Sequence, residues 1–144
     1  MEDFLVQTEL SYDQMLEQFH LLKQLNPNLK ETNFKTMLAE MFQYPYKMLG
    51  VFENGKCIAI SGYWIMTKFY CGRYLEMDNV VVDENYRSKG IGKLICDELE
   101  KIALKENCRV MMLDAYISNE SAQVFYEREG FEKKGYHFLK RLNS

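Results

Sequence analysis

Residues 80–92, with the sequence VVVDENYRSKGIG, combine residue types whose spacing predicts anion chemistry. A β-branched run leads through a polar turn into the glycine pair of residues 90–92, where a helix is expected to begin. Glycines leave successive backbone N–H groups uncovered, and a helix N-terminus adds partial positive charge at the same place. Arg87, Lys89 and Lys93 supply cations nearby. The segment therefore predicts a binding site for a diphosphate.

The glycine spacing separates this loop from two common phosphate-binding motifs. A Walker loop requires GxxxxGK[ST], and Leu94 stands where that motif needs a hydroxyl residue. A dinucleotide fingerprint requires GxGxxG, and Ile95 takes the place of its third glycine. The string RSKGIG at 87–92 instead resembles the RxxGxG coenzyme A pyrophosphate loop of the GCN5-related N-acetyltransferases, the GNAT family.

A second segment, residues 113–131, resembles the other signature of the same family. It carries, in order, Asn119, Ala122, Phe125, Tyr126, Gly130 and Phe131. The two signatures together cover residues 75–131 in the family's order and separation, and the N-terminal half agrees in the order of its elements. The chain is therefore identified as a member of the family, with one N-acetyltransferase domain over residues 1–144.

The resemblance implies a mixed α/β fold and acetyl-CoA as co-substrate. Its central, mostly antiparallel twisted sheet would have six to seven strands, flanked by about four helices and splayed where coenzyme A binds. The pantetheine arm would pair with the backbone of Val80 and Val82 and be reached by Asn119, and Arg87 would cap the turn. The family pattern assigns the pyrophosphate to the backbone N–H groups of Ser88, Lys89, Gly90, Ile91 and Gly92.

Acetyl transfer to an amine needs a base, an oxyanion donor and an acid. The strand N–H of Val80 could stabilise the oxyanion. The phenol of Tyr126 is expected to protonate the departing thiolate. Glu76 and Asp78 are both candidates for the base, because residues two apart on a strand share a face; a water relay is a third possibility.

The identity of the acceptor stays open at this stage. It could be a small amine, an amino sugar or a peptide amine, and the resemblance places the region of Tyr44 and Tyr46 over its site. An alternative function is a sensor that binds acyl-CoA without chemistry. Because a degenerate sensor would be expected to lose Tyr126 and the carboxylates, the enzyme is favoured; a homodimer is possible.

The pattern along the chain predicts the elements that position these residues. Ser11 and Gln14 form a capping box for a helix that Pro27 ends, and Thr32 or Asn33 is expected to cap a second. The dipeptide at 54–55, Asn-Gly, predicts a hairpin. The remaining predicted elements are strands at 3–9, 47–53, 56–70, 74–82, 109–115 and 136–142 and helices at 90–106 and 119–129.

Composition restricts the class of protein. The 144 residues include 18 basic and 21 acidic side chains, for a net charge of −3, and 47% are hydrophobic. We therefore expect a globular protein rather than a dedicated nucleic-acid binder. The four cysteines form no CxxC pair, so no metal site is expected. The acidic start, MEDF, and the absence of a 20-residue apolar run predict no membrane segment and a cytoplasmic protein.

Overall fold

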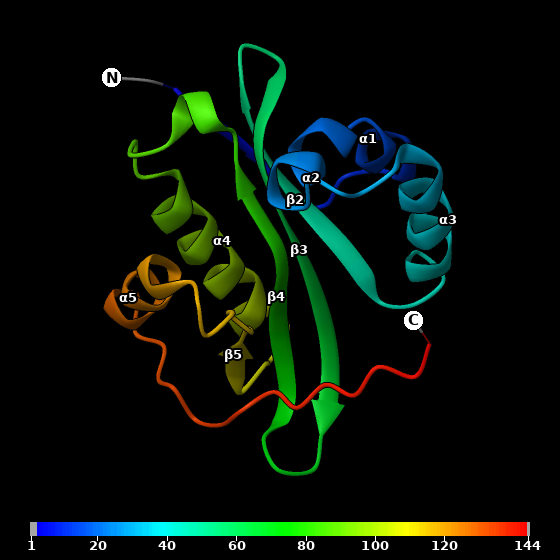
Figure 1. Ribbon diagram of the computed structural model, residues 1–144. Helices are drawn as coiled ribbons and strands as arrows, with labels where there is room; N and C mark the ends of the chain where they lie inside the picture. Colours follow the sequence, from blue (N-terminus) through cyan, green and yellow to red (C-terminus); the bar gives the residue numbers. More distant parts are fainter. Residues whose placement is uncertain (1–2, 144) are drawn as a thin grey trace. The chain divides into compact units, whose positions relative to one another are not determined.

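A computed structural model describes residues 3–143, which form two compact units that meet in sequence between Leu113 and Asp114 (Figure 1). The first unit contains all five strands of the sheet and four of the helices. The strands are β1 (Leu5–Gln7), β2 (Tyr46–Glu53), β3 (Lys56–Lys68), β4 (Gly72–Val82) and β5 (Val110–Met112). The helices are α1 (Tyr12–Leu16), α2 (Phe19–Leu25), α3 (Glu31–Met41), α4 (Ile91–Lys105) and, in the second unit, α5 (Glu120–Arg128).

The sheet has the strand order β1-β2-β3-β4-β5 and is antiparallel except for the parallel pair of β4 and β5. Helices α1 to α3 lie on one face of the sheet and α4 lies on the other (Figure 1). This arrangement confirms the mixed α/β fold class, with five strands among the described residues instead of six to seven.

Local signals explain the central hairpin and the first helix. Asn54 and Gly55 have φ values of 50° and 82°, as a two-residue turn between β2 and β3 requires. Ser11 accepts a hydrogen bond from the backbone N–H of Gln14, and Gln14 accepts one from the Ser11 N–H. Both predictions are therefore confirmed. Each was readable from the sequence because it depends only on neighbouring residues.

The helices before β2 depart from the prediction in two places. The single helix expected between Ser11 and Pro27 is divided into α1 and α2. The expected cap at Thr32 or Asn33 is wrong, because α3 begins after Lys30, which has no side-chain cap. The helix starts earlier and buries Phe34 and Leu38 against the sheet, so burial fixes its register rather than a capping side chain.

Helix α4 packs against the opposite face of the sheet. Ile91, Ile95, Leu99 and Ala103 recur every four residues and are all buried. This stripe confirms the predicted helix and holds its N-terminus at the end of the loop that follows β4.

The last predicted strand, 136–142, is wrong, because residues 132–143 contain no strand. Tyr136 and Phe138 are 84% and 91% exposed, so the alternating pattern has no apolar surface to cover in this structure. A period-two pattern forms a strand only where a neighbouring strand supplies hydrogen bonds. Among residues 3–143, no helix is both long and apolar enough to cross a bilayer.

Candidate functional site

A β-bulge in β4 marks the centre of the site. Gly62 of β3 faces Asp78 and Ile60 faces Val81, so two residues of β4, Asn79 and Val80, lie opposite one residue of β3. Asn79 has a φ of 54°, in the left-handed region. Such bulges bend a strand and change the direction of the groups that follow them.

Next to the bulge, β4 has backbone N–H and C=O groups on an edge that no other strand of the described residues covers. Val81 pairs with Ile60, and successive residues of an antiparallel strand turn their backbone N–H and C=O groups to opposite sides. The Asp83 N–H donates to the Ile58 carbonyl at 2.8 Å, so Val82, the residue before it, turns these groups away from β3. Val80 lies within the bulge, two residues before Val82. On that side the pairing of β4 with β5 ends at Glu76, so among the described residues no strand covers the edge beyond it.

The loop after β4 is ordered by its own side chains. Asp83 is 5% exposed and accepts a hydrogen bond from the Asn85 N–H at 2.9 Å, which caps the short 3₁₀ helix Glu84–Tyr86. The Tyr86 hydroxyl donates to Glu53 Oε1 at 2.8 Å and so links the loop to β2. Arg87 Nε donates to the Val82 carbonyl at 3.4 Å and so links the turn to the end of β4.

The glycine loop is shaped for close approach of a ligand to the backbone. Ser88 and Gly90 have φ values of 65° and 79°, and Gly90 is the residue that precedes the first turn of α4. A Cβ atom at Gly90 would meet no atom within 4 Å, so the space in front of this backbone is open. Left-handed residues beside a helix N-terminus direct N–H groups toward a common point, which suits an anion. Ser88, Lys89 and Gly90 are exposed there, while Ile91 anchors the helix in the core.

The two candidate carboxylates lie on the sheet face that carries α1 to α3. Cross-strand partners share a face, and Glu76 is opposite Trp64, which is opposite Tyr46. Trp64 Nε1 donates to Asp78 Oδ2 at 3.0 Å, so the indole holds this carboxylate in place. Both carboxylates are half-buried.

Tyr46 packs beside this pair and reaches the bulge. Its ring centroid lies 4.9 Å from that of Trp64, and its side chain hydrogen-bonds with Asn79. Burial raises the pKa of the Tyr46 hydroxyl far above its usual value, so the group stays protonated at any physiological pH. Gly62 permits this packing, because a Cβ atom there would lie 2.3 Å from the Tyr46 oxygen.

The sequence did not predict that Tyr46, Trp64, Asp78 and Asn79 would form one cluster. The family resemblance had placed a tyrosine of this region over the acceptor site, but Trp64 and Asn79 had no assigned role. Their contact depends on the register of β2, β3 and β4 and on the bulge, which no local signal in the sequence specifies.

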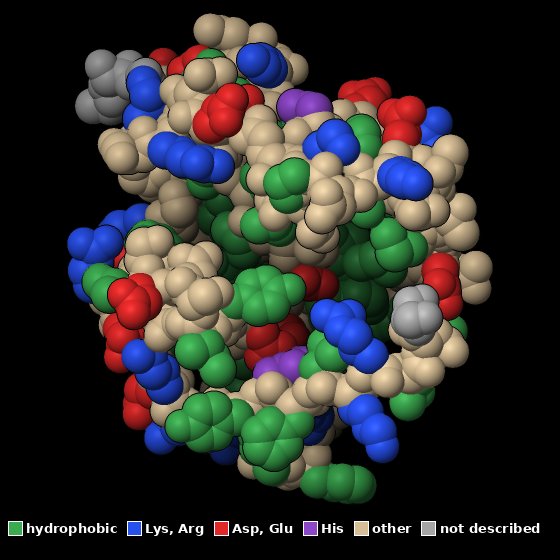
Figure 2. All heavy atoms as spheres, viewed as in Figure 1, with side chains coloured by type: hydrophobic (Ala, Val, Ile, Leu, Met, Phe, Trp, Pro, Cys, Tyr) green, Lys and Arg blue, Asp and Glu red, His purple; other side chains and the backbone are tan. Residues whose placement is uncertain are grey.

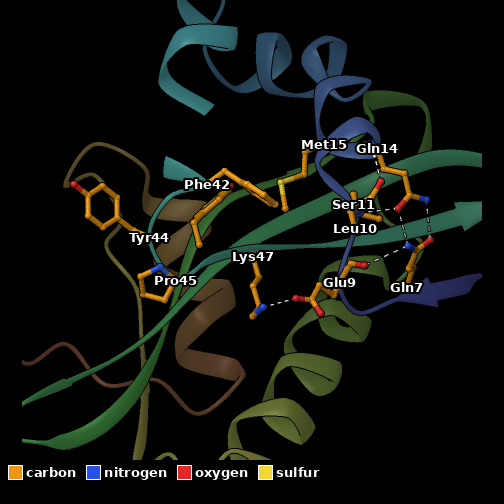
Figure 3. Close-up of a pocket in the computed structure, with 11 residues that line it drawn as sticks. Gln7, Glu9, Leu10, Ser11, Gln14, Met15, Phe42, Tyr44, Pro45 and Lys47 are labelled. Atoms are coloured by element: carbon orange, nitrogen blue, oxygen red, sulfur yellow. Dashed lines mark hydrogen bonds and ion pairs between the residues drawn. The ribbon is translucent and has the colours of Figure 1, made fainter. Parts of the chain in front are cut away.

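Two hollows in the first unit border Tyr46. The first, of about 440 Å³, lies between the β1–α1 connection and the start of β2 (Figure 3). Its floor is polar, with a reciprocal hydrogen bond between Gln7 and Gln14 and an ion pair between Glu9 and Lys47 (Figure 3).

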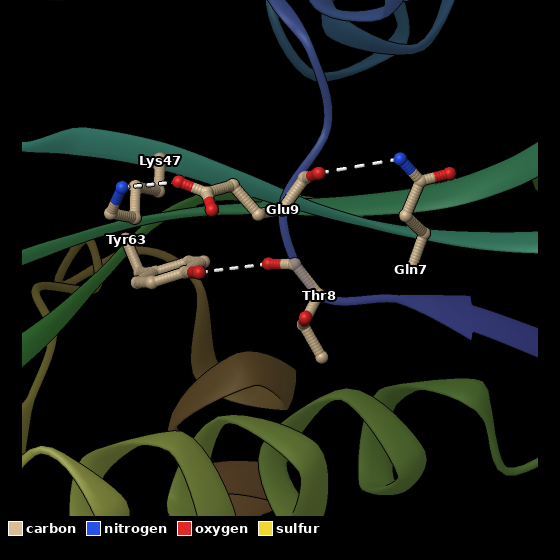
Figure 4. Close-up of polar contacts among 5 residues, drawn as sticks. All are labelled: Gln7, Thr8, Glu9, Lys47 and Tyr63. Carbon is tan, nitrogen blue, oxygen red and sulfur yellow. Dashed lines mark hydrogen bonds and ion pairs between the residues drawn. The ribbon is translucent and has the colours of Figure 1, made fainter.

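Hydrogen bonds tie the wall of this first hollow to the sheet. Tyr63 donates to the Thr8 carbonyl at 2.8 Å, and Gln7 donates to the Glu9 carbonyl at 3.3 Å (Figure 4). Most of its polar side chains therefore already have partners within the protein, namely Gln7, Glu9, Ser11, Gln14 and Lys47. No residue of β4 lines it.

The second hollow, of about 220 Å³, lies between α2, α3 and the bulge. Hydrophobic side chains gather between these helices on the surface in Figure 2. Tyr46 and Asn79 are the members of its lining that connect it to the cluster around Asp78. This hollow therefore borders the bulge of β4.

The second unit carries the remaining predicted site residues. Asn119 Oδ1 accepts from the Ala122 N–H at 3.2 Å and caps α5, as the sequence pattern indicates. Tyr126 is half-buried, and its ring makes edge contacts with those of Phe125 and Phe131. Gly130 follows the helix end with a φ of 97°, the left-handed conformation that glycine commonly adopts there.

Among residues 3–143, no group of three or more His, Cys, Asp or Glu side chains is placed to hold a metal ion. Within residues 3–143 none of the four cysteines forms a disulfide, and Cys57 and Cys96 are buried.

Comparison with known proteins identifies the family. The profile of the Acetyltransferase (GNAT) family matches residues 13–131. Glucosamine 6-phosphate N-acetyltransferase 1 of Dictyostelium discoideum is 26% identical over 133 residues, which are 91% of this chain and 73% of that protein. The chain belongs to the GNAT family and is an acetyl-CoA-dependent N-acetyltransferase.

Solved structures agree with the fold. The crystal structure of glucosamine-6-phosphate N-acetyltransferase from Arabidopsis thaliana has a TM-score of 0.76 and 26% identity, over 99% of this chain and 100% of that one. Aminoglycoside N-acetyltransferase AAC(6')-Iy, solved in complex with CoA, has a TM-score of 0.84 over 100% of this chain and 97% of that one. At 18% identity, the second likeness bears on the fold alone.

Proposed function

We propose that the protein moves an acetyl group from acetyl-CoA to a primary amine by direct attack of the amine in a ternary complex, with residues 1–144 acting as one domain. The observation that carries this proposal is the open edge of β4, at Val80 and Val82, which leads directly into the exposed glycine loop at the N-terminus of α4. One continuous stretch of backbone thus offers donors for an extended amide-bearing arm and then for a diphosphate.

Coenzyme A binding is assigned residue by residue. The backbones of Val80 and Val82 pair with the amides of pantetheine, and Asn119 reaches the same arm through its side-chain amide. The pyrophosphate is held by the N–H groups of Ser88, Lys89, Gly90, Ile91 and Gly92. Arg87 stabilises the turn through its hydrogen bond to the Val82 carbonyl.

The chemistry requires a neutral amine, because an ammonium has no lone pair for attack on the thioester carbon. As the C–N bond forms, negative charge on the carbonyl oxygen is stabilised by the Val80 N–H. Asp78, with Glu76 as its alternative, takes the proton that the nitrogen loses, directly or through water. As the C–S bond breaks, Tyr126 donates its phenolic proton to the leaving thiolate.

Asp78 is the preferred base on two structural grounds. It immediately precedes the bulge, and the Trp64 indole fixes its position. Glu76 lies further from Val80 along the strand.

The acceptor is an amine on a small molecule or a peptide, and the names of the relatives support a small molecule. A homodimer stays a prediction that light scattering can test. A cytoplasmic location stays a prediction that cell fractionation can test.

The proposal is tested by measuring thiol release from acetyl-CoA across a panel of amines, with mass spectrometry of the acetylated product. Asp78→Asn should lower kcat/KM most near neutral pH and recover part of it at high pH, where the free amine is already deprotonated. Glu76→Gln is the matched control on the same strand face. Recovery in Glu76→Gln alone would transfer the role of base to Glu76, and no acetylated product from any amine would refute the proposal.

A further inference from the structure

We propose that the second hollow, between α2, α3 and the bulge of β4, binds the acceptor, and that this acceptor is a primary amine on an apolar carbon skeleton. The inference rests on the proposed function, because it assigns the substrate of that same site. It goes further by choosing an alkyl- or arylalkylamine over an amino sugar phosphate or a polyamine.

The lining of the hollow is the first reason. Its walls come from one side of α2 and one side of α3, and most of the side chains are Leu, Met or Phe. Phe34 and Leu38 are buried at its base, while Leu25 and Met37 are 49% and 45% exposed at its mouth. A ligand can therefore enter the hollow from solvent at Leu25 and Met37. Its inner end, near the sheet, is lined by buried apolar side chains.

The absence of charge in this lining is the second reason. None of the described residues that line the hollow is charged, and its polar members are Asn26, Tyr46 and Asn79. A phosphate or a second ammonium group would lose its hydration there without a compensating partner, which is costly. An apolar body gains free energy in the same place.

The position of the polar end is the third reason. Asn79 lines the hollow and directly precedes Val80, the residue proposed above to stabilise the oxyanion of the thioester. An amine at this end lies beside the Tyr46 hydroxyl, with the Asp78 carboxylate held next to it by Trp64. Burial favours the neutral form of an amine, which is the form that attacks.

The volume limits the size of the skeleton. An apolar cavity of about 150 Å³ holds one benzene molecule. The hollow, at about 220 Å³, therefore holds a ring with a short chain, or an alkyl chain of about six carbons. Hexylamine and 2-phenylethylamine are suitable probes.

The test measures kcat/KM for propylamine, butylamine, pentylamine, hexylamine and 2-phenylethylamine with saturating acetyl-CoA, beside glucosamine 6-phosphate and spermidine. Each added methylene should raise kcat/KM about fourfold until the hollow is full. The two polar amines should be poorer substrates than hexylamine.

A variant that narrows the mouth sharpens the test. Met37→Trp should lower kcat/KM for hexylamine at least about tenfold and leave that for propylamine within about twofold, since only the longer chain reaches the mouth. Leu104→Trp, at a site on α4 that is 67% exposed and outside the hollow, is the matched control and should change neither value.

The outcomes separate the two claims. The inference is supported if kcat/KM rises with alkyl chain length and if Met37→Trp lowers kcat/KM for the longer chains only. A flat series, a preference for glucosamine 6-phosphate or spermidine, or equal effects of the two Trp variants would overturn it while the acetyltransferase function stands. Failure of every amine to accept the acetyl group would overturn both.

Discussion

The close contact between Gly62 and Tyr46 leads to a quantitative prediction about Gly62→Ala. The added Cβ atom would lie 2.3 Å from the Tyr46 oxygen and 2.7 and 2.8 Å from two ring carbons. Unstrained contacts between carbon atoms are about 3.5–4.0 Å, so the ring must move by about 1 Å. It has little freedom to do so, because Tyr46 is 3% exposed and packs against Trp64.

The cost combines two effects. Overpacking of this size destabilises by about 1–3 kcal/mol, and loss of the hydrogen bond to Asn79 adds about 1 kcal/mol. For a chain of this length we expect a fall in Tm of about 6–12 °C. Calorimetry at neutral pH measures this shift, with Gly135→Ala as the matched control, because a Cβ atom at Gly135 meets nothing within 4 Å.

A double-mutant cycle assigns the effect to the contact itself. In a Tyr46→Phe background the nearest clashing atom is gone, so Gly62→Ala should cost less than it does in the unmodified protein. An unchanged Tm in Gly62→Ala, or equal costs in both backgrounds, would show that the Tyr46 hydroxyl does not lie over Gly62 and would remove the basis for its contact with the bulge.

Two further predictions concern the thiol in the core and the proposed acid. Burial raises the pKa of Cys57 to about 11 from its usual value of 9.0, so its contribution to stability is complete below pH 9 and is lost as the pH rises through 11. The unmodified protein should therefore lose about 2 kcal/mol more than Cys57→Ala between these pH values, measured by urea unfolding, and parallel pH profiles would contradict this. Tyr126→Phe should lower kcat about 100-fold with little change in KM for acetyl-CoA, whereas full activity would leave Tyr126 as a packing residue.

The sequence predicted those parts of the fold that depend on neighbouring residues. The capping box of Ser11 and Gln14, the Asn54-Gly55 turn and the buried stripe of α4 each carry their signal within a few residues. The glycine loop at 87–92 could likewise be recognised in the sequence, because its spacing excludes the Walker loop and the dinucleotide fingerprint.

The parts that the sequence did not predict depend on contacts between distant segments. The bulge at Asn79 exists only in relation to the register of β3, and the bond between Trp64 and Asp78 follows from that register. Helix α3 begins where the burial of Phe34 requires, and residues 136–142 show that a strand-like pattern alone does not form a strand. Contacts within the assembled sheet determine these features, so neighbouring residues alone do not predict them.

The central claim is that the glycine loop after β4 holds the pyrophosphate of acetyl-CoA, and titration calorimetry with coenzyme A tests it most directly. The unmodified protein should bind coenzyme A with a measurable heat. Gly90→Val should lose this binding at least about 100-fold, because a branched side chain is strained at a φ of 79° and covers the backbone N–H groups, while the circular dichroism of the fold is kept. Equal Kd values for the two folded proteins would contradict the account.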